Sequence, residues 1–146
     1  MESHDVWTKF QPKFARVGDL CKYVKFFKQL LKSTLTACAE QNILIVELRH
    51  TTGMLFDENR ESIKVLDEVA MIESVAEEVR KDYPYFQLML ILTCYKIVGK
   101  PHAKKIIGHI KEANKKFPHL IGGFDMVNEE EFTPEISEFA PDILGA

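Results

Sequence analysis

The sequence has 146 residues, a net charge of −3 and a hydrophobic content of 46%, which is typical of one globular domain. These values give no electrostatic reason for a nucleic-acid partner, and no apolar run approaches the roughly 20 residues that span a membrane. The opening residues, MESHDVWTKF, lack the apolar core of a signal peptide. We therefore expect residues 1–146 to form a single segment with no nucleic-acid or membrane partner.

Three cysteines, Cys21, Cys38 and Cys94, show no CxxC or zinc-finger spacing. Cys21 and Cys38 are expected on one helix, too far apart for a disulfide. We interpret all three as small buried hydrophobic residues, which favours a reducing compartment.

Helical and strand patterns alternate along the chain. In the first helix, apolar residues recur at helical spacing after Asp19, a candidate N-cap. The strands are continuous apolar runs, as in parallel sheets covered on both faces. The predicted elements are a helix over 19–38, a strand over 43–48, a helix over 61–81, a strand over 86–94, a helix over 101–117 and a strand over 120–127.

This alternation predicts an α/β fold with three parallel strands and right-handed helical crossovers. An open doubly wound sheet and a slice of a (β/α)₈ TIM barrel both fit. A whole barrel takes about 250 residues, so this chain would supply about three of its eight units. An open three-stranded sheet would leave two long apolar edges. We therefore expect a partial barrel whose edges are covered by a partner or by a second copy of the chain.

In either architecture the functional residues lie at the carboxyl ends of the strands. Glu47 and Arg49 are either an ion pair or ligand-binding residues, and Tyr95 is either an interface aromatic or a site residue. Asp125 is either a hydrogen-bonded structural acid or a site acid. The candidates are Glu47, Arg49, His50, Cys94, Tyr95, Lys96, Asp125, Asn128 and Glu130.

A complete catalytic set is not recognisable from these residues. The five histidines form no HxH, HxxH or HExxH pair, and His102 and His109 are about 10 Å apart by helical rise. There is no Gly-rich phosphate loop and no GxSxG elbow. The basic stretch KKIIGHIKEANKK (104–116) is interpreted as a helix with a solvated face, with a phosphate-binding patch as the alternative.

Three segments in order, VWTKFQPKF, QNILIVELRH and KKFPHLIGGFDMVNEEEF, resemble the adenosine-deaminase-related growth factor family. That family has the patterns W-x-K-F-x-x-x-F, D-N-V-x-Y-L-E-x-R and K-F-P-x-x-x-x-G-F-D-L-V-G-x-E-D. The likeness runs from Val6 to about Phe139. It implies strands two to four of an extracellular, zinc-dependent TIM barrel that deaminates adenosine to inosine.

The resemblance also implies which parts of the family's site are present. The family's zinc ligands come from an HxH, an H-A-G-E and a late aspartate, which match nothing in this chain, so no catalytic residue, metal ligand or resident cofactor is expected here. The substrate-binding residues implied are Trp7, Lys9, Phe10, Phe14, Glu47, Tyr95, Asp125 and Asn128.

Two of these residues depart from the family pattern. Tyr95 replaces a histidine that faces the substrate, and Asn128 replaces a glycine whose backbone approaches the purine. We expect an adenosine-deaminase-like chain that binds adenosine weakly and is inactive alone. The alternative is a non-catalytic binding or growth-factor-like module derived from the deaminase barrel.

Overall fold

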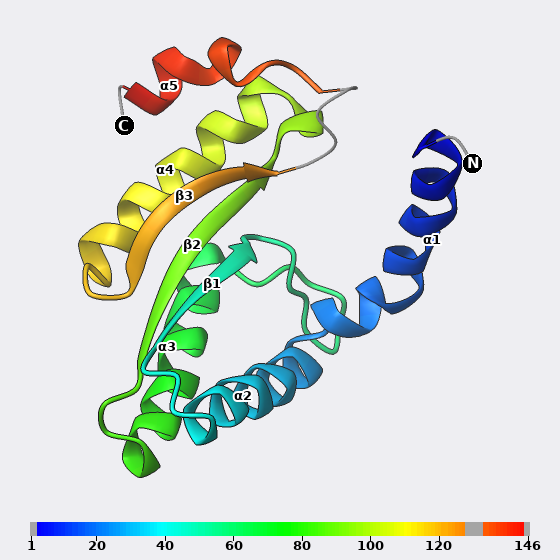
Figure 1. Ribbon diagram of the computed structural model, residues 1–146. Helices are drawn as coiled ribbons and strands as arrows, with labels where there is room; N and C mark the ends of the chain where they lie inside the picture. The colour runs from blue at the N-terminus through cyan, green and yellow to red at the C-terminus, as the bar shows by residue number, and fades with distance from the viewer. Residues whose placement is uncertain (1–2, 128–132, 145–146) are drawn as a thin grey trace.

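The computed structural model describes residues 3–127 and 133–144, in which helices and strands alternate (Figure 1). Asn128 and Glu130 lie outside the described residues. The elements in order are α1 (Ser3–Lys22), α2 (Val24–Glu40), β1 (Ile45–Thr51), α3 (Val65–Asp82), β2 (Gln87–Tyr95), the 3₁₀ helix η1 (Lys96–Val98), α4 (Lys100–Lys116), β3 (Ile121–Val127), the 3₁₀ helix η2 (Ile136–Phe139) and α5 (Ala140–Leu144).

The strands form one parallel sheet in the order β1-β2-β3. The helices α3 and α4 connect successive strands, as the alternating sequence pattern predicted. The fold class, three parallel strands with flanking helices, is confirmed. Within the described chain β1 and β3 are both edge strands, so neither has a neighbour on its outer side.

The core lies between one face of the sheet and the helices, which Figure 1 shows along one side of the strands. The strand residues Leu88, Leu90 and Leu92 are almost fully buried on this face. They share the core with apolar residues of α3 and α4, and α2 packs on α3. We call this face of the sheet the helix face. In contrast, α1 projects away from the sheet.

The first predicted helix is wrong in its boundaries. Asp19 is inside α1, where its carboxylate accepts from Arg60 Nη1 at 3.3 Å. The helix breaks at Tyr23, whose extended backbone precedes α2. The backbone of Phe56 causes the break: its carbonyl accepts from Val24 N–H at 2.9 Å, and its N–H donates to Lys22 at 3.0 Å. Hydrophobic periodicity cannot predict this break, because Phe56, which bonds to the backbone there, is more than 30 residues away in the sequence.

Two further predictions about the helices are also wrong. Cys21 and Cys38 lie on α1 and α2 rather than on one helix, and both are free thiols. The second predicted helix begins at Val65 rather than Glu61. The residues before Val65 belong to a loop in which Phe56 pairs with Ser62 and Ile63 N–H donates to Leu55.

The register of β3 shifts beside two glycines. The shift lies between Leu90 and Ile91 of β2. A Cβ on Gly122 would lie 2.9 Å from Met89 Cε and 3.3 Å from Met89 Cβ, and one on Gly123 would lie 3.2 Å from Ile91 Cδ1. The side chains of β2 therefore occupy the space that larger residues in β3 would need.

We expect Gly122→Ala to lower the free energy of unfolding by about 1–3 kcal/mol, the usual cost of overpacking. Gly108→Ala is the matched control, because Gly108 is within α4 and an added Cβ meets nothing within 4 Å. That variant should gain about 0.5–1 kcal/mol from helix propensity. Urea unfolding measures both. Equal effects of the two substitutions would contradict the packing described for β3.

A buried acid joins α3 to the turn before β3. Glu73 accepts from Arg80 Nη1 at 3.1 Å and from His119 Nε2 at 3.0 Å. Burial alone would raise the pKa of Glu73, but the hydrogen bonds and positive charges of Arg80 and His119 outweigh it and lower that pKa below 4.5. The ionised carboxylate is therefore the form that the fold stabilises.

A lowered folded-state pKa gives stability that is present above the unfolded value and is lost as the pH falls through the folded value. We therefore expect Glu73→Gln to be less stable than the parent chain at pH 6, with the difference shrinking below about pH 4.5. Denaturant titrations at several pH values measure this. Glu77→Gln, an exposed neighbour on α3, is the control, and a pH-independent difference for Glu73→Gln would contradict the expectation.

Candidate functional site

The sheet has a second face, opposite the helix face, whose side chains are more exposed. We call this second face the inner face. Because side chains alternate along a strand, every second residue of each strand points to it. In β1 it is exposed at Ile45, Glu47 and Arg49, while the intervening side chains are more buried. Its members are Ile45, Glu47, Arg49 and Thr51 of β1; Met89, Ile91, Thr93 and Tyr95 of β2; and Gly123, Asp125 and Val127 of β3.

An ion pair crosses the inner face from β1 to β3. Arg49 Nε donates to Asp125 Oδ2 at 3.0 Å, and Met126 N–H donates to Asp125 Oδ1 at 2.8 Å. Arg49 therefore pairs with Asp125 and not with Glu47. The ion pair is partly open to solvent, since the two side chains are 72% and 38% exposed. A polar ligand can therefore reach this pair without unfolding the sheet.

The hydroxyl groups of Thr51 and Thr93 lie 2.9 Å apart near the carboxyl ends of their strands. Thr93 is opposite Asp125 in the register, so this threonine pair and the ion pair are neighbours on the inner face. The fully buried Cys94 belongs to the helix face. Burial, and then the charge of Asp125, raise the pKa of its thiol. Cys94 is thus kept protonated at neutral pH and is a poor nucleophile.

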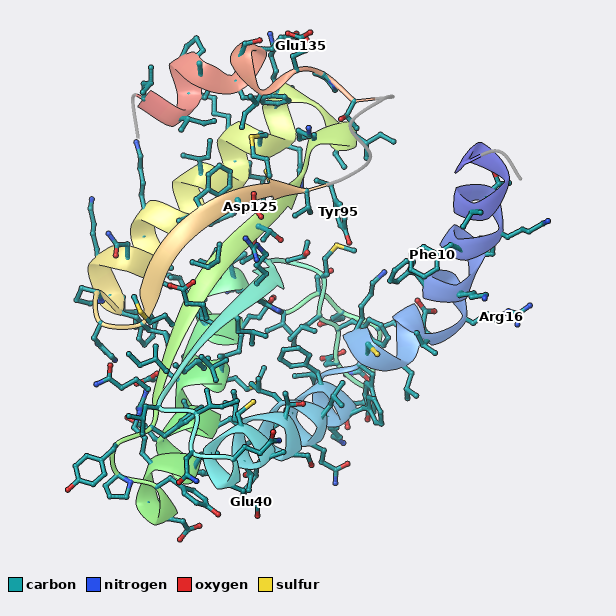
Figure 2. All side chains as sticks on the ribbon, in the orientation of Figure 1. Phe10, Arg16, Glu40, Tyr95, Asp125 and Glu135 are labelled. Carbon is teal, nitrogen blue, oxygen red and sulfur yellow. The ribbon has the colours of Figure 1, made fainter. Side chains whose placement is uncertain are left out.

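The predicted substrate-binding residues fall into two separate groups. Tyr95 and Asp125 lie at the same end of the sheet, on β2 and β3, whereas Phe10 lies apart from them on α1 (Figure 2). Phe10 and Phe14 pack edge to face, with ring centroids 4.8 Å apart. The structure does not bring α1 onto the inner face.

The remaining predicted residues add little to either group. Glu47 is exposed on the inner face, two residues before Arg49, and Lys9 is exposed on α1. Asn128 and the side chain of Trp7 lie outside what the structure describes.

His50, predicted at the site, instead faces the helices. The residue is 8% exposed, and its ring packs against Phe27 and is hydrogen-bonded through Nε2 to Glu68 Oε1 of α3. Glu68 is fully buried, and its second oxygen accepts from Gly53 N–H at 3.1 Å. Sequence reasoning missed Glu68 because its helical position reads as solvated.

The described residues contain no group of three or more His, Cys, Asp or Glu side chains that could hold a metal ion. Within the same ranges, no helix is long and apolar enough to cross a membrane.

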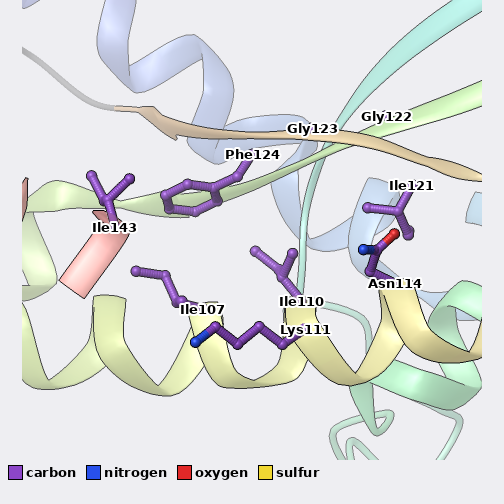
Figure 3. A pocket seen from close by; sticks show the side chains of 9 residues that line it. All are labelled: Ile107, Ile110, Lys111, Asn114, Ile121, Gly122, Gly123, Phe124 and Ile143. Carbon is purple, nitrogen blue, oxygen red and sulfur yellow. The ribbon is translucent and has the colours of Figure 1, made fainter. Parts of the chain in front are cut away.

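A mainly apolar groove of about 370 Å³ lies along the outer side of β3, between that strand, α4 and α5 (Figure 3). Phe124 and Ile143 line it with Ile107 and Ile110 of α4, and Lys111 and Asn114 are its polar members. Among the residues that the structure describes, no acid, histidine or cysteine lines it. The groove is therefore better suited to packing an additional apolar segment of protein beside β3 than to catalysis.

The chain is similar in sequence to adenosine deaminases over most of its length. It is 24% identical over 141 residues to an adenosine deaminase of Aedes albopictus, covering 96% of this chain and 26% of the relative. It is 25% identical over 133 residues to human adenosine deaminase 2, covering 86% of this chain and 25% of the relative. The chain thus spans about a quarter of the length of these relatives. No protein-family model matches the sequence.

The fold is similar to that of a solved amidohydrolase. A crystal structure of a zinc-bound amidohydrolase from Burkholderia ambifaria matches 86% of this chain and 32% of its own, with a TM-score of 0.66 and 16% sequence identity. This likeness bears on the fold alone: the three strands and their helices match part of that chain, as expected for a segment of a (β/α)₈ barrel. The chain is therefore similar in sequence to one segment of adenosine deaminases, and its three parallel strands with flanking helices have the fold of part of a (β/α)₈ barrel.

Proposed function

We propose that residues 1–146 form the substrate-facing wall of an adenosine-deaminase-type barrel. The observation that carries this proposal is the inner face, where Arg49, Asp125 and Tyr95 gather at the carboxyl ends of parallel strands. In a closed barrel this end holds the active site. A solvent-accessible carboxylate and guanidinium at this end would bind the polar groups of a nucleoside.

The zinc chemistry of the family belongs to segments that this chain does not match. A catalytic zinc needs three protein ligands and an open position for water, and the family draws its ligands from an HxH, an H-A-G-E and a late aspartate. None of these patterns occurs in residues 1–146. We therefore propose that this chain holds no zinc, contributes substrate contacts, and does not deaminate adenosine alone. An extracellular location is proposed on the same resemblance.

The test is an adenosine titration and a deamination assay on the purified chain with added zinc. Trp7 is the only tryptophan, so its fluorescence reports a purine stacking on α1, and calorimetry in the same titration reports adenosine binding at the inner face, which lies apart from α1. We expect nearly unchanged emission, no inosine, and less than one zinc per chain by elemental analysis. Asn128→Gly should allow weak quenching at most, because it restores the glycine that the family resemblance implies at this position and adds no catalyst.

Inosine formation by the unmodified chain, abolished by a chelator, would overturn the proposal. Adenosine binding without turnover, lost in Asp125→Asn but kept in Glu135→Gln, would support a substrate wall. Glu135 is an exposed acid near η2 and outside the inner face, so it controls for net charge. If calorimetry as well as Trp7 emission shows no adenosine binding by the parent chain or by Asn128→Gly, the non-catalytic module with another ligand becomes the better description.

A further inference from the structure

The outer side of β1 is an open edge of the sheet, because no strand lies beside it within the described residues. Just before β1, Leu44 O accepts from Gln87 N–H of β2 at 2.7 Å. In the parallel register of these strands, every second residue from Leu44 onward therefore directs its N–H and C=O groups toward β2. The residues between them direct theirs to the open edge, and these residues are Ile45, Glu47, Arg49 and Thr51.

Two opposite charges lie on this open edge. Glu47 and Arg49 are both exposed, and they are two residues apart on the inner face. Leu48, between them, is the middle residue of the seven-residue strand Ile45–Thr51. A second copy of β1, antiparallel and with the two Leu48 residues facing each other, pairs the strand along its whole length. Glu47 of each copy then lies opposite Arg49 of the other, with both side chains on the same face. The open edge is therefore complementary to itself in charge.

Other antiparallel registers lose this complementarity. Moving the two-fold axis by one residue along β1 places Glu47 opposite Glu47, or Arg49 opposite Arg49. Like charges directly opposite each other destabilise a pair of strands, and fewer residues are then paired. An axis between two residues brings open-edge residues opposite residues whose backbone groups bond to β2. Charges on an edge strand normally oppose pairing, whereas the charges of β1 favour one register.

We propose that two copies of the chain pair through the open edge as antiparallel β1 strands, with Leu48 on the two-fold axis. The interface is isologous, so each copy contributes the same residues. Arg49 keeps its bond to Asp125, because its Nε donates to that carboxylate at 3.0 Å and its other guanidinium N–H groups are left to donate to Glu47 of the second copy. This pairing goes beyond the proposed substrate wall and does not require the chain to bind adenosine.

Disulfide cross-linking of the full chain tests the register. In the proposed pair the two Leu48 residues form a non-hydrogen-bonded pair with Cα atoms about 4.5 Å apart, which is within the range of a disulfide. Leu48→Cys, in a background of Cys21→Ser and Cys38→Ser, should therefore give a covalent dimer under mild oxidation. Cys94 is buried and stays in place. Val46→Cys is the matched control, since Val46 is on the same face of β1 and its two copies lie about 14 Å apart along the strands.

Light scattering over a dilution series tests the charges. Glu47→Arg should weaken self-association about tenfold or more, because two like-charged pairs replace two opposite ones across the axis. Arg49→Glu should weaken it similarly. An equimolar mixture of the two variants should restore association, since each pair is then oppositely charged again. Glu77→Arg, exposed on α3 rather than on the sheet, controls for net charge and should leave association unchanged. Circular dichroism shows that each variant is folded.

A parent chain that is monomeric at micromolar concentration would overturn the proposal. Leu48→Cys that cross-links no faster than Val46→Cys would overturn it too, because the strands would not meet in this register. A mixture of the two charge variants that associates no better than either variant alone would show that Glu47 and Arg49 do not face each other, with the same consequence. Cross-linking at Leu48 together with rescue by mixing is the result that supports the pairing.

Discussion

Replacement of Glu68 by alanine is expected to lower the free energy of unfolding by about 3–5 kcal/mol, the usual cost of breaking a buried pair. Glu68 is fully buried in α3 and is hydrogen-bonded to His50, which is 8% exposed, and to Gly53 N–H. Its removal leaves a buried imidazole and a backbone N–H without an acceptor. Because whole domains are stable by only about 5–15 kcal/mol, this single change threatens cooperative folding.

Chemical denaturation of the parent and variant measures the difference. Glu77→Ala on the same helix is exposed and should change stability by less than about 0.5 kcal/mol. The double variant His50→Leu, Glu68→Met should recover much of the loss, because apolar replacement of both members of a buried pair is often neutral. A Glu68→Ala chain as stable as Glu77→Ala would show that the pair does not support the fold.

The strands and the class of fold were predictable because their signals are local. The runs ILIVEL, FQLMLILTC and LIGGFDMV each contribute most of a strand in the parallel sheet. The break at Tyr23 was not predictable, since the backbone of Phe56 causes it across the loop after β1. The pairing of His50 with Glu68 was missed for a similar reason: an acid near a helix start reads as solvated until its tertiary partner is known.

The candidate site was predictable only in part. In parallel sheets, functional residues lie at the carboxyl ends of the strands. This rule correctly predicted that Tyr95 and Asp125 lie at the same end of the sheet. It predicted that Glu47 and Arg49 either form an ion pair or bind a ligand, whereas Arg49 pairs with Asp125 on another strand. The partner of Arg49 depends on the register of the strands, because the shift beside Gly123 determines the position of Asp125 relative to β1. Asp125 is therefore a structural acid in the isolated chain, and it remains accessible for a ligand.

The exposed apolar surface leads to a prediction about association. The two edge strands have no outer neighbours in the described chain, and Ile45 on the inner face is 57% exposed. On α1, apolar residues recur on one side of the helix, and Phe14 is 59% exposed. Surfaces of this kind normally mark contacts with other protein. We propose that copies of the chain cover these surfaces for one another, as a complete barrel would cover the inner face.

The purified chain should therefore elute above the 16.8 kDa of one copy in size-exclusion chromatography with light scattering. Phe14→Lys combined with Ile45→Lys should shift the mass toward one copy, because charges on both surfaces oppose their burial. Leu144→Lys is the matched control: Leu144 is 85% exposed on α5, which lies apart from the two substituted elements, α1 and β1 (Figure 1), and its charge should leave the mass unchanged. A parent chain that is monomeric at micromolar concentration and unfolds cooperatively would mean that three open strands are stable without a partner.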